Sequence, residues 1–294
     1  MATTYNIQRL MAIILFILSF IASSAQGDYE KVRGNYRKAE VLGLTGAGVK
    51  IAVIDVGGNR VGTRGVDDIW IDYTYGYDFV DEDTVLTTSS HHGNFVLSII
   101  KSNIGLAPDA TVYFLKVAND VGTKDDAAVL EALQYCIDSG VQIITVSLSL
   151  ANEVEEKVAE CIAAGIAVVG ATGPDIMGQF TVALPGTCPG AVAVTAISST
   201  DGNVYTNVLP NPTVENSHGV SLAASGVDCD VIGRTGVPVT SNGPSFSAPW
   251  IAGAFAIYKQ RYPTMSNQAV MQMLIDRAIK LPNTTNFGAG RPTF

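Results

Sequence analysis

Five short apolar runs constrain the fold of this chain more than any other feature. They are almost continuously apolar and rich in β-branched residues, and they occupy residues 49–55, 111–117, 141–147, 166–171 and 191–196. A strand that is apolar on both faces must be covered on both faces, which is typical of a parallel sheet buried between two layers of helices. The runs therefore predict the strands of such a sheet.

Helical patterns lie between and after these runs. The hydrophobic spacing predicts helices at residues 92–104, 125–139, 153–164, 247–261 and 266–279. Strands that alternate with helices imply right-handed crossovers, so the predicted fold class is α/β, with a three-layer, doubly wound and mainly parallel sheet. No linker or repeat interrupts residues 26–294, which favours a single domain. In such a fold the ligand site lies beyond the carboxyl ends of the strands.

The charge of the chain excludes several classes of partner. Its 294 residues include 18 Lys and Arg against 27 Asp and Glu, a net charge of −9, and no run of basic residues. Binding to nucleic acid or to an anionic membrane depends on clustered positive charge. We therefore expect no nucleic acid and no stable membrane partner, and we expect a monomer.

The first 25 residues have the organisation of a signal peptide. Arg9 precedes an apolar run at residues 10–21, and small residues follow up to Ala25, which is the pattern of a secretory signal and its cleavage site. A membrane-spanning helix needs roughly 20 apolar residues, more than this run offers. We expect cleavage after Ala25 and secretion; the alternative is a membrane anchor formed by an uncleaved signal. Residues 26–54 would then be too few for a long pro-domain.

Secretion affects the interpretation of the four cysteines. They are Cys136, Cys161, Cys188 and Cys229. An even number in an oxidising compartment permits two disulfides. Neighbouring positions favour Cys136 with Cys161, which leaves Cys188 with Cys229. A chain of this size can also fold around free buried thiols, so both states are open at this point.

Three polar residues stand where the predicted fold places a ligand site. Asp55 ends the first predicted strand, His92 begins a predicted helix, and Ser245 lies in the turn before residues 247–261. Taken singly, each has an ordinary alternative: a turn cap, a solvated loop and a helix N-cap. Together they supply the carboxylate, imidazole and hydroxyl of a Ser-His-Asp triad. The order Asp, His, Ser and the absence of a G-x-S-x-G motif separate the chain from hydrolases with a nucleophile elbow.

The segments around these residues resemble the subtilisin-like serine protease family (peptidase S8). The similarity covers residues 38–282. Its motifs lie at residues 49–57, 92–96, 105–110 and 243–253. The resemblance implies an endopeptidase in which Asp55 orients His92, His92 is the general base and acid, and Ser245 is the nucleophile. It also implies polypeptide substrates, protein inhibitors as further partners, and no cofactor.

The resemblance assigns neighbouring residues as well. The reactive histidine of the family directly precedes a glycine, which selects His92 over His91, while His218 falls in a polar loop. The strand that lines the family's substrate site corresponds to Ser147, Leu148 and Ser149. Calcium sites are common in the family, and the acidic stretch 81–83 is the one candidate ligand set; otherwise these charges are solvated.

Two prolines stand where the family has donors to the oxyanion of the reaction. Pro174 takes the position of the usual asparagine, and Pro244 that of a threonine before the nucleophile. Proline has no N–H and no side-chain donor, which leaves the backbone N–H of Ser245. Loss of one such donor lowers kcat on the order of 10²–10³-fold, as measured in this family. A shift of one residue would let Thr172 turn inward instead.

Two hypotheses of function follow. The first is a secreted serine endopeptidase, which the complete set of three triad residues favours. The second is a catalytically weak or inactive homologue that keeps its groove for binding peptides or inhibitors. The two prolines favour this second hypothesis, as does the expected lack of a long pro-domain. Val56 is a milder departure, which removes a hydroxyl donor next to Asp55.

Overall fold

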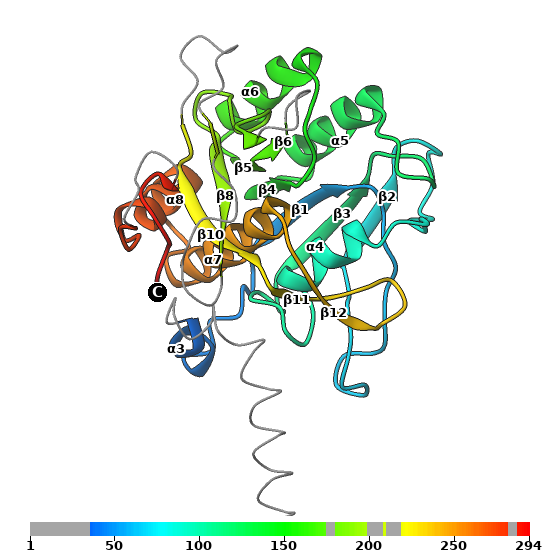
Figure 1. The fold of residues 1–294 in the computed structure, drawn as a ribbon, viewed down its shortest axis with the longest axis horizontal. Helices are drawn as coiled ribbons and strands as arrows, with labels where there is room; N and C mark the ends of the chain where they lie inside the picture. The colour runs from blue at the N-terminus through cyan, green and yellow to red at the C-terminus, as the bar shows by residue number, and fades with distance from the viewer. Residues whose placement is uncertain (1–35, 175–179, 199–207, 210–218, 282–286) are drawn as a thin grey trace, which may run out of the picture.

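The computed structural model describes residues 36–174, 180–198, 208–209, 219–281 and 287–294 (Figure 1). The predicted signal peptide at residues 1–25 and His218 lie outside the described residues. Within the described part of the chain, no helix is long and apolar enough to cross a membrane.

A seven-stranded parallel sheet forms the centre of the molecule, in the order β10-β8-β5-β4-β1-β3-β2. Its strands are β1 (Lys50–Asp55), β2 (Tyr75–Asp78), β3 (Thr111–Lys116), β4 (Ile143–Val146), β5 (Ala167–Ala171), β8 (Val192–Ser198) and β10 (Leu222–Val227). The predicted α/β class with a mainly parallel sheet is confirmed. The apolar pattern does not predict β2 or β10, because β2 is short and half polar and β10 consists largely of small residues.

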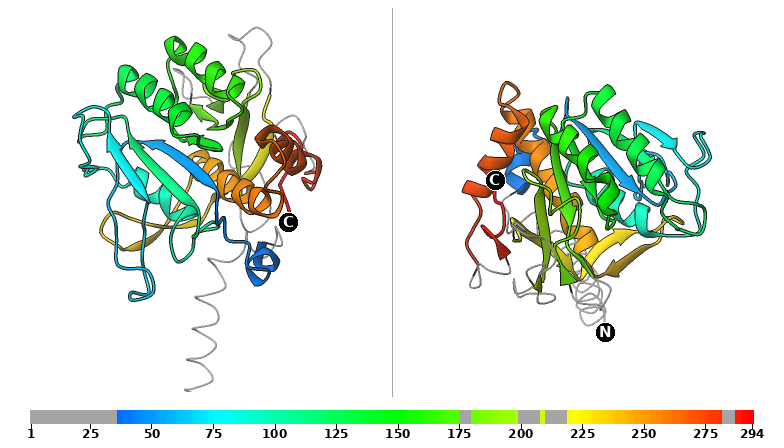
Figure 2. Two further views of the ribbon diagram at one scale, coloured as in Figure 1. Left: turned by 180° about the vertical axis from the view of Figure 1, so that it is seen from behind. Right: turned by 90° about the horizontal axis from the view of Figure 1, so that it is seen from above.

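Helices cover both faces of this sheet (Figures 1 and 2). They are α3 (Tyr36–Val41), α4 (His92–Ile100), α5 (Asp126–Asp138), α6 (Glu155–Ala163), α7 (Ser247–Arg261) and α8 (Asn267–Asp276), with 3₁₀ turns η1 (Asn152–Val154) and η2 (Pro244–Phe246). Side chains of α4, α7 and α8 pack on one face, and those of α5 and α6 on the other. In β1, Ile51 and Val53 join the first layer, while Ala52 and Ile54 join the second. The strands are continuously apolar for this reason.

Helix α7 is buried around almost its whole circumference, from Ser247 to Lys259. Such a helix is apolar on all sides because neighbours surround it. A Cβ added at Gly253 would lie 2.9 Å from Leu106 Cβ, so this glycine permits a close approach to the chain after α4. Because α7 is packed on nearly all sides, the η2 turn at its amino end is held in place.

Two small sheets complete the described structure. Strands β11 (Cys229–Ile232) and β12 (Pro238–Ser241) form an antiparallel hairpin that leads into η2. Strands β6 (Gly173–Pro174), β7 (Phe180–Thr181) and β9 (Val208–Leu209) form the other.

The first predicted helix is shorter than its pattern indicates, since α4 ends at Ile100 and not at residue 104. Lys101 leaves the helical conformation and buries its Nζ against the carbonyl of Ala110. Ser102 Oγ then donates to the carbonyl of Ser98 at 2.6 Å and accepts from the N–H of Ile104 at 3.1 Å, and so closes the helix end.

The disulfide alternative is wrong, because all four cysteines are free. Cys136, Cys161 and Cys188 lie buried in the layer beneath α5 and α6. The Cys161 thiol donates to the carbonyl of Leu133 at 3.6 Å. Burial raises the pKa of Cys161 to about 12, so this thiol stays protonated and unreactive at neutral pH.

Candidate active site

The carboxyl end of β1 places Asp55 in the interior. Its side chain is fully buried, and Oδ1 accepts a hydrogen bond of 2.8 Å from the N–H of Val56. Among the described residues, Oδ2 has no hydrogen-bond partner. The neighbouring Val56 has no hydroxyl, which is the kind of side-chain donor that this oxygen lacks.

His92 is the first residue of α4 and contacts Asp55 directly. The distance between His92 Nδ1 and Asp55 Oδ1 is 2.8 Å, and the imidazole is 30% exposed. The negative charge of Asp55 raises the pKa of His92, and the hydrogen bond adds to this, while burial opposes it. Because an ionised carboxylate only accepts, Nδ1 carries the hydrogen and Nε2 is left as the acceptor.

A glycine lets α4 come this close to β1. A Cβ added at Gly93 would lie 2.1 Å from the carbonyl oxygen of Gly57. The side chain of Asn94 reinforces this contact, since it accepts from the N–H of Asn59 and donates to the carbonyl of Asn59, each at 2.8 Å. Sequence reasoning missed Asn94; a buried amide in an otherwise apolar helix face is the signal that marks it.

His91 points away from Asp55. Its exposed ring lies 5.7 Å from the Phe95 ring, and its Nδ1 accepts from the N–H of Arg234 at 3.3 Å. His91 therefore contacts the turn of the β11–β12 hairpin, and of these two histidines His92 alone contacts Asp55.

Ser245 lies in η2, directly before α7. Its N-cap alternative does not apply, because Phe246 is the residue before α7 and no side chain caps that helix. Ser147 Oγ donates to the carbonyl of Ser245 at 2.7 Å, and Ser245 Oγ donates to the carbonyl of Ser147 at 3.5 Å. Gly243 has a φ of +152°, a conformation that favours glycine at the start of this turn.

Helix α4 packs beside the turn that carries Ser245. The ring of Phe95 meets that of Phe246 edge to face, with centroids 6.1 Å apart. Phe246 is buried. This contact joins the element that begins with His92 to the element that contains Ser245.

A cavity of about 220 Å³ opens beside Ser245. It is lined by residues 147–149, 171–173 and 242–245, so Ser147, Leu148 and Ser149 all belong to its wall. Thr172 also lines it and is buried, and its Oγ1 has no hydrogen-bond partner within the described structure. Among the described residues, the lining carries hydroxyl and amide groups and no charged side chain.

Pro174 follows the wall of this cavity in β6, where it pairs with Phe180 of β7. Pro244 is buried at the start of η2, directly before Ser245. Neither residue can donate a hydrogen bond. The backbone N–H of Ser245 is thus the donor that the turn itself retains.

The acidic stretch 81–83 forms an exposed turn. Asp83 Oδ1 accepts from the N–H of Val85 at 2.7 Å, and Asp83 pairs through its backbone with Asp78. Asp78 itself turns inward to Lys116, a buried lysine that sequence reasoning missed. The signal for it is the lone charge at the end of the apolar run in β3.

Comparisons with known proteins agree with this geometry. A family model described as the subtilase family, peptidase S8, matches residues 46–291. Alkaline elastase YaB of Bacillus sp. (strain YaB) is 28% identical and the alignment covers 86% of this chain and 65% of that protein. Subtilisin DY of Bacillus licheniformis is 26% identical, with 86% and 92% covered.

A solved structure has the same fold. The crystal structure of MycP1 with its N-terminal propeptide removed superposes with a TM-score of 0.68 and 21% sequence identity. The match covers 90% of this chain and 94% of that one. At this identity the likeness concerns the fold alone.

Proposed function

This chain belongs to the subtilase family, and on that premise we propose that it is a secreted serine endopeptidase that forms an acyl-enzyme on Ser245. The observation that carries the proposal is the contact of the buried Asp55 with His92, 2.8 Å apart, beside the turn that presents Ser245 to a cavity.

In the proposed reaction, each of the three residues has one role. Asp55 accepts from Nδ1–H of His92, so Nε2 is free to take the hydroxyl proton of Ser245. Ser245 Oγ then attacks the peptide carbonyl, and His92 returns the proton to the leaving amine. His92 then takes a proton from water, which attacks the acyl-enzyme. The peptide acid is released, and His92 returns the proton to Ser245 Oγ, which restores the hydroxyl.

The oxyanion of the tetrahedral intermediate needs donors. The backbone N–H of Ser245 is one, and the amino end of η2 and α7 adds a favourable dipole. Pro174 and Pro244 add none. We therefore expect a slower enzyme than a relative with both side-chain donors.

We propose that the cavity beside Ser245 takes a side chain of a polypeptide substrate, held through the wall formed by residues 147–149. Extended peptides bind to exposed strand edges through main-chain hydrogen bonds, and pockets then select their side chains. Because the part of the lining that the structure describes is uncharged, we expect an uncharged side chain in it.

A second candidate function is a peptide- or inhibitor-binding homologue with little or no activity. The two prolines at the oxyanion side of the site favour it. In that case the groove would still bind peptides, and Ser245 would react slowly or not at all.

A fluorophosphonate probe separates the two candidates, because it reacts only with an activated serine. We expect stoichiometric labelling of the wild type, no labelling of Ser245→Ala, and full labelling of Ser241→Ala, a serine on β12 that does not line the cavity. A folded wild-type protein that takes up no probe would exclude the endopeptidase.

Secretion is part of the proposal and rests on residues 1–25. Expression of the full chain with a carboxyl-terminal tag should release a product that begins at Gln26. Amino-terminal sequencing of the medium and membrane fractions tests this, and an intact amino terminus in the membrane fraction would support the anchored alternative.

A further inference from the structure

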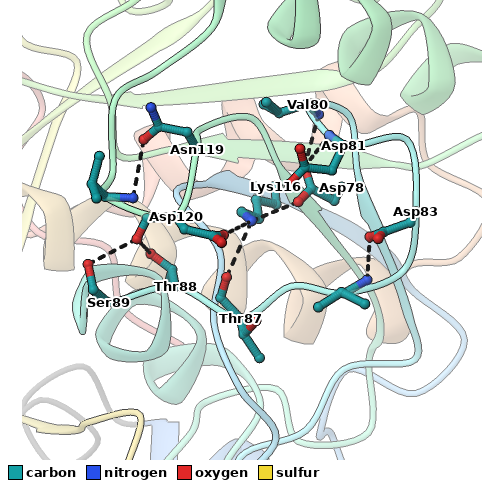
Figure 3. Close-up of polar contacts among 12 residues, drawn as sticks. Asp78, Val80, Asp81, Asp83, Thr87, Thr88, Ser89, Lys116, Asn119 and Asp120 are labelled. Carbon is teal, nitrogen blue, oxygen red and sulfur yellow. Dashed lines mark hydrogen bonds and ion pairs between the residues drawn. The ribbon is translucent and has the colours of Figure 1, made fainter.

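A buried lysine lies next to the proposed active site without a role in the reaction. Lys116 ends β3, and its side chain is 1% exposed. Strand register places it between Asp55 of β1 and Asp78 of β2, in one row at the carboxyl ends of three adjacent strands. Figure 3 shows its ammonium group surrounded by oxygen atoms.

Two carboxylates and a carbonyl hold this ammonium. Lys116 Nζ lies 2.7 Å from Asp78 Oδ2 as an ion pair and 2.6 Å from Asp120 Oδ1, and it donates to the carbonyl of Thr87 at 3.3 Å. Burial alone would lower the pKa of Lys116, but the bonds to Asp120 and Asp78 outweigh it and leave the pKa above its ordinary value. Lys116 therefore carries a positive charge at neutral pH.

Asp120 extends the contact to the segment before α4. Its backbone carbonyl accepts from Ser89 N and Ser89 Oγ, each at 2.9 Å, and from Thr88 Oγ1 at 3.2 Å (Figure 3). The next residue, Ser90, accepts through its Oγ from the N–H of His92 at 3.1 Å. The N–H of Ser90 also donates to Thr88 Oγ1 at 3.2 Å. Hydrogen bonds therefore link Lys116 through Asp120, Thr88 and Ser90 to the backbone of His92.

The aliphatic part of the Lys116 side chain also contacts the segment that follows Asp55. A Cβ added at Gly57 would lie 2.9 Å from Lys116 Cδ, so the lysine stem packs against the turn that follows Asp55. One side chain thus touches the segment after Asp55 and the segment before His92.

We propose that Lys116 is a positioning residue for His92, which clamps the residue 87–90 segment through Thr87 and Asp120 and so keeps the imidazole on Asp55. The inference rests on the proposed function, in which His92 is the general base. Stability alone does not explain this lysine, because a buried ion pair contributes little compared with apolar side chains of similar size.

The pKa of His92 distinguishes two roles of Lys116: its positive charge, and its hold on the position of the imidazole. The titratable groups around it are Asp78 on β2, Asp120 in the turn after β3, Asp55 on β1 and His92 on α4. Loss of the cation alone would leave more negative charge and raise the pKa of His92. Loss of position would separate His92 from Asp55 and lower that pKa.

The test uses a double variant, Lys116→Met with Asp78→Asn, since the single Lys116→Met leaves a buried carboxylate uncompensated and risks misfolding. Lys124→Met is the matched control, because Lys124 lies on the same turn but pairs with the surface residue Asp126. Lys116→Arg tests whether a cation of different shape restores the clamp. All variants are compared with the wild type by circular dichroism.

Two readouts are measured on each folded variant. NMR titration of the three histidines reports the pKa of His92, and fluorophosphonate labelling reports its activity as a base. In the double variant we expect a lower pKa of His92 and labelling slowed on the order of 10²-fold, the loss that small misplacements of catalytic groups produce. We expect partial recovery in Lys116→Arg and wild-type behaviour in Lys124→Met.

The outcomes separate this inference from the proposed function. A folded double variant with an unchanged or raised pKa of His92 and full labelling would overturn the inference, because this variant removes one positive and one negative charge and should lower the pKa of His92 only if the segment before α4 moves. Absence of labelling in the wild type would count against the endopeptidase. The titration would still test the clamp, because it requires no activity.

Discussion

Among single residues, the contact between Asp55 and His92 has the clearest chemical consequence. The negative charge of the buried Asp55 raises the pKa of His92 above its ordinary value of 6.5. A protonated imidazole cannot accept the proton of Ser245. The same contact that orients His92 therefore also limits the acidic range in which it can act.

We expect kcat/KM to rise with pH through this raised pKa, with a midpoint above 6.5. In Asp55→Asn the midpoint should fall, because the negative charge that raises the pKa of His92 is lost. We also expect kcat to drop on the order of 10⁴-fold, because no carboxylate then holds the tautomer with hydrogen on Nδ1. A pH–rate profile of both proteins measures this. A flat rate between about pH 5 and 8 would contradict the role of His92.

The stability of the folded state should change in the opposite sense. Because the folded-state pKa of His92 is raised, the charged pair stabilises the protein fully below the unfolded pKa, and this contribution is lost as pH rises through the folded pKa. Thermal unfolding over the same pH range, compared with Asp55→Asn, measures it.

Pro174 should affect the rate through the missing side-chain donor to the oxyanion, and not through the triad residues. Pro174→Asn would restore a side-chain donor at the oxyanion, and we expect kcat to rise by up to about 10²–10³-fold with little change in KM. Pro174→Ala is the control, since it removes the proline without adding a side-chain donor. Equal rates in the asparagine and alanine variants would indicate that another group, for example Thr172, already serves the oxyanion.

At the level of elements, the approach of α4 to the end of β1 decides the geometry of the site. His92 reaches Asp55 because Gly93 leaves no side chain between the helix and the carbonyl of Gly57. The series of contacts from Lys116 then holds the segment that leads into α4. The position of one helix relative to one strand end thus determines whether the imidazole meets its carboxylate.

Gly93→Ala should therefore disrupt both stability and activity. Its Cβ would lie 2.1 Å from Gly57 O, so α4 must shift, at a cost of about 1–3 kcal/mol of unfolding free energy, and labelling of Ser245 should slow. Gly219→Ala is the control, because a Cβ there has no atom of the described residues within 4 Å. Denaturant unfolding and probe labelling measure the two effects, and a wild-type labelling rate in Gly93→Ala would contradict this view of α4.

In the whole molecule, two apolar layers on either side of one sheet provide the core. Cys136, Cys161 and Cys188 contribute to one layer as small buried side chains without cross-links. A domain of this size buries enough apolar surface to fold without disulfides.

The thermal stability of the protein should accordingly be the same with and without a reducing agent. Thiol titration in denaturant should detect all four cysteines. A lower Tm in reductant, together with fewer reactive thiols, would show that disulfides form in solution. Neither measurement depends on catalysis, so both apply equally to an inactive homologue.

Predictions from the sequence succeeded where the cause is local. The runs that became β1, β3, β4, β5 and β8 are apolar on both faces because both faces are covered. The predictions from the sequence failed where the structure of a segment depends on residues far away in the chain. Strand β2 has no apolar signal, and its edge position depends on β3; the end of α4 depends on the contact of Lys101 with the Ala110 carbonyl.

The sequence by itself determined the α/β class of this protein and the identity of its candidate residues Asp55, His92 and Ser245, because apolar periodicity and short motifs involve near neighbours in the chain. Only the tertiary structure decided that the imidazole of His92 lies 2.8 Å from Asp55, that the cysteines stay unpaired, and that Lys116 lies in one row with Asp55. Those outcomes depend on distances between segments far apart in the chain, which the register of parallel strands and the packing of α4 bring together.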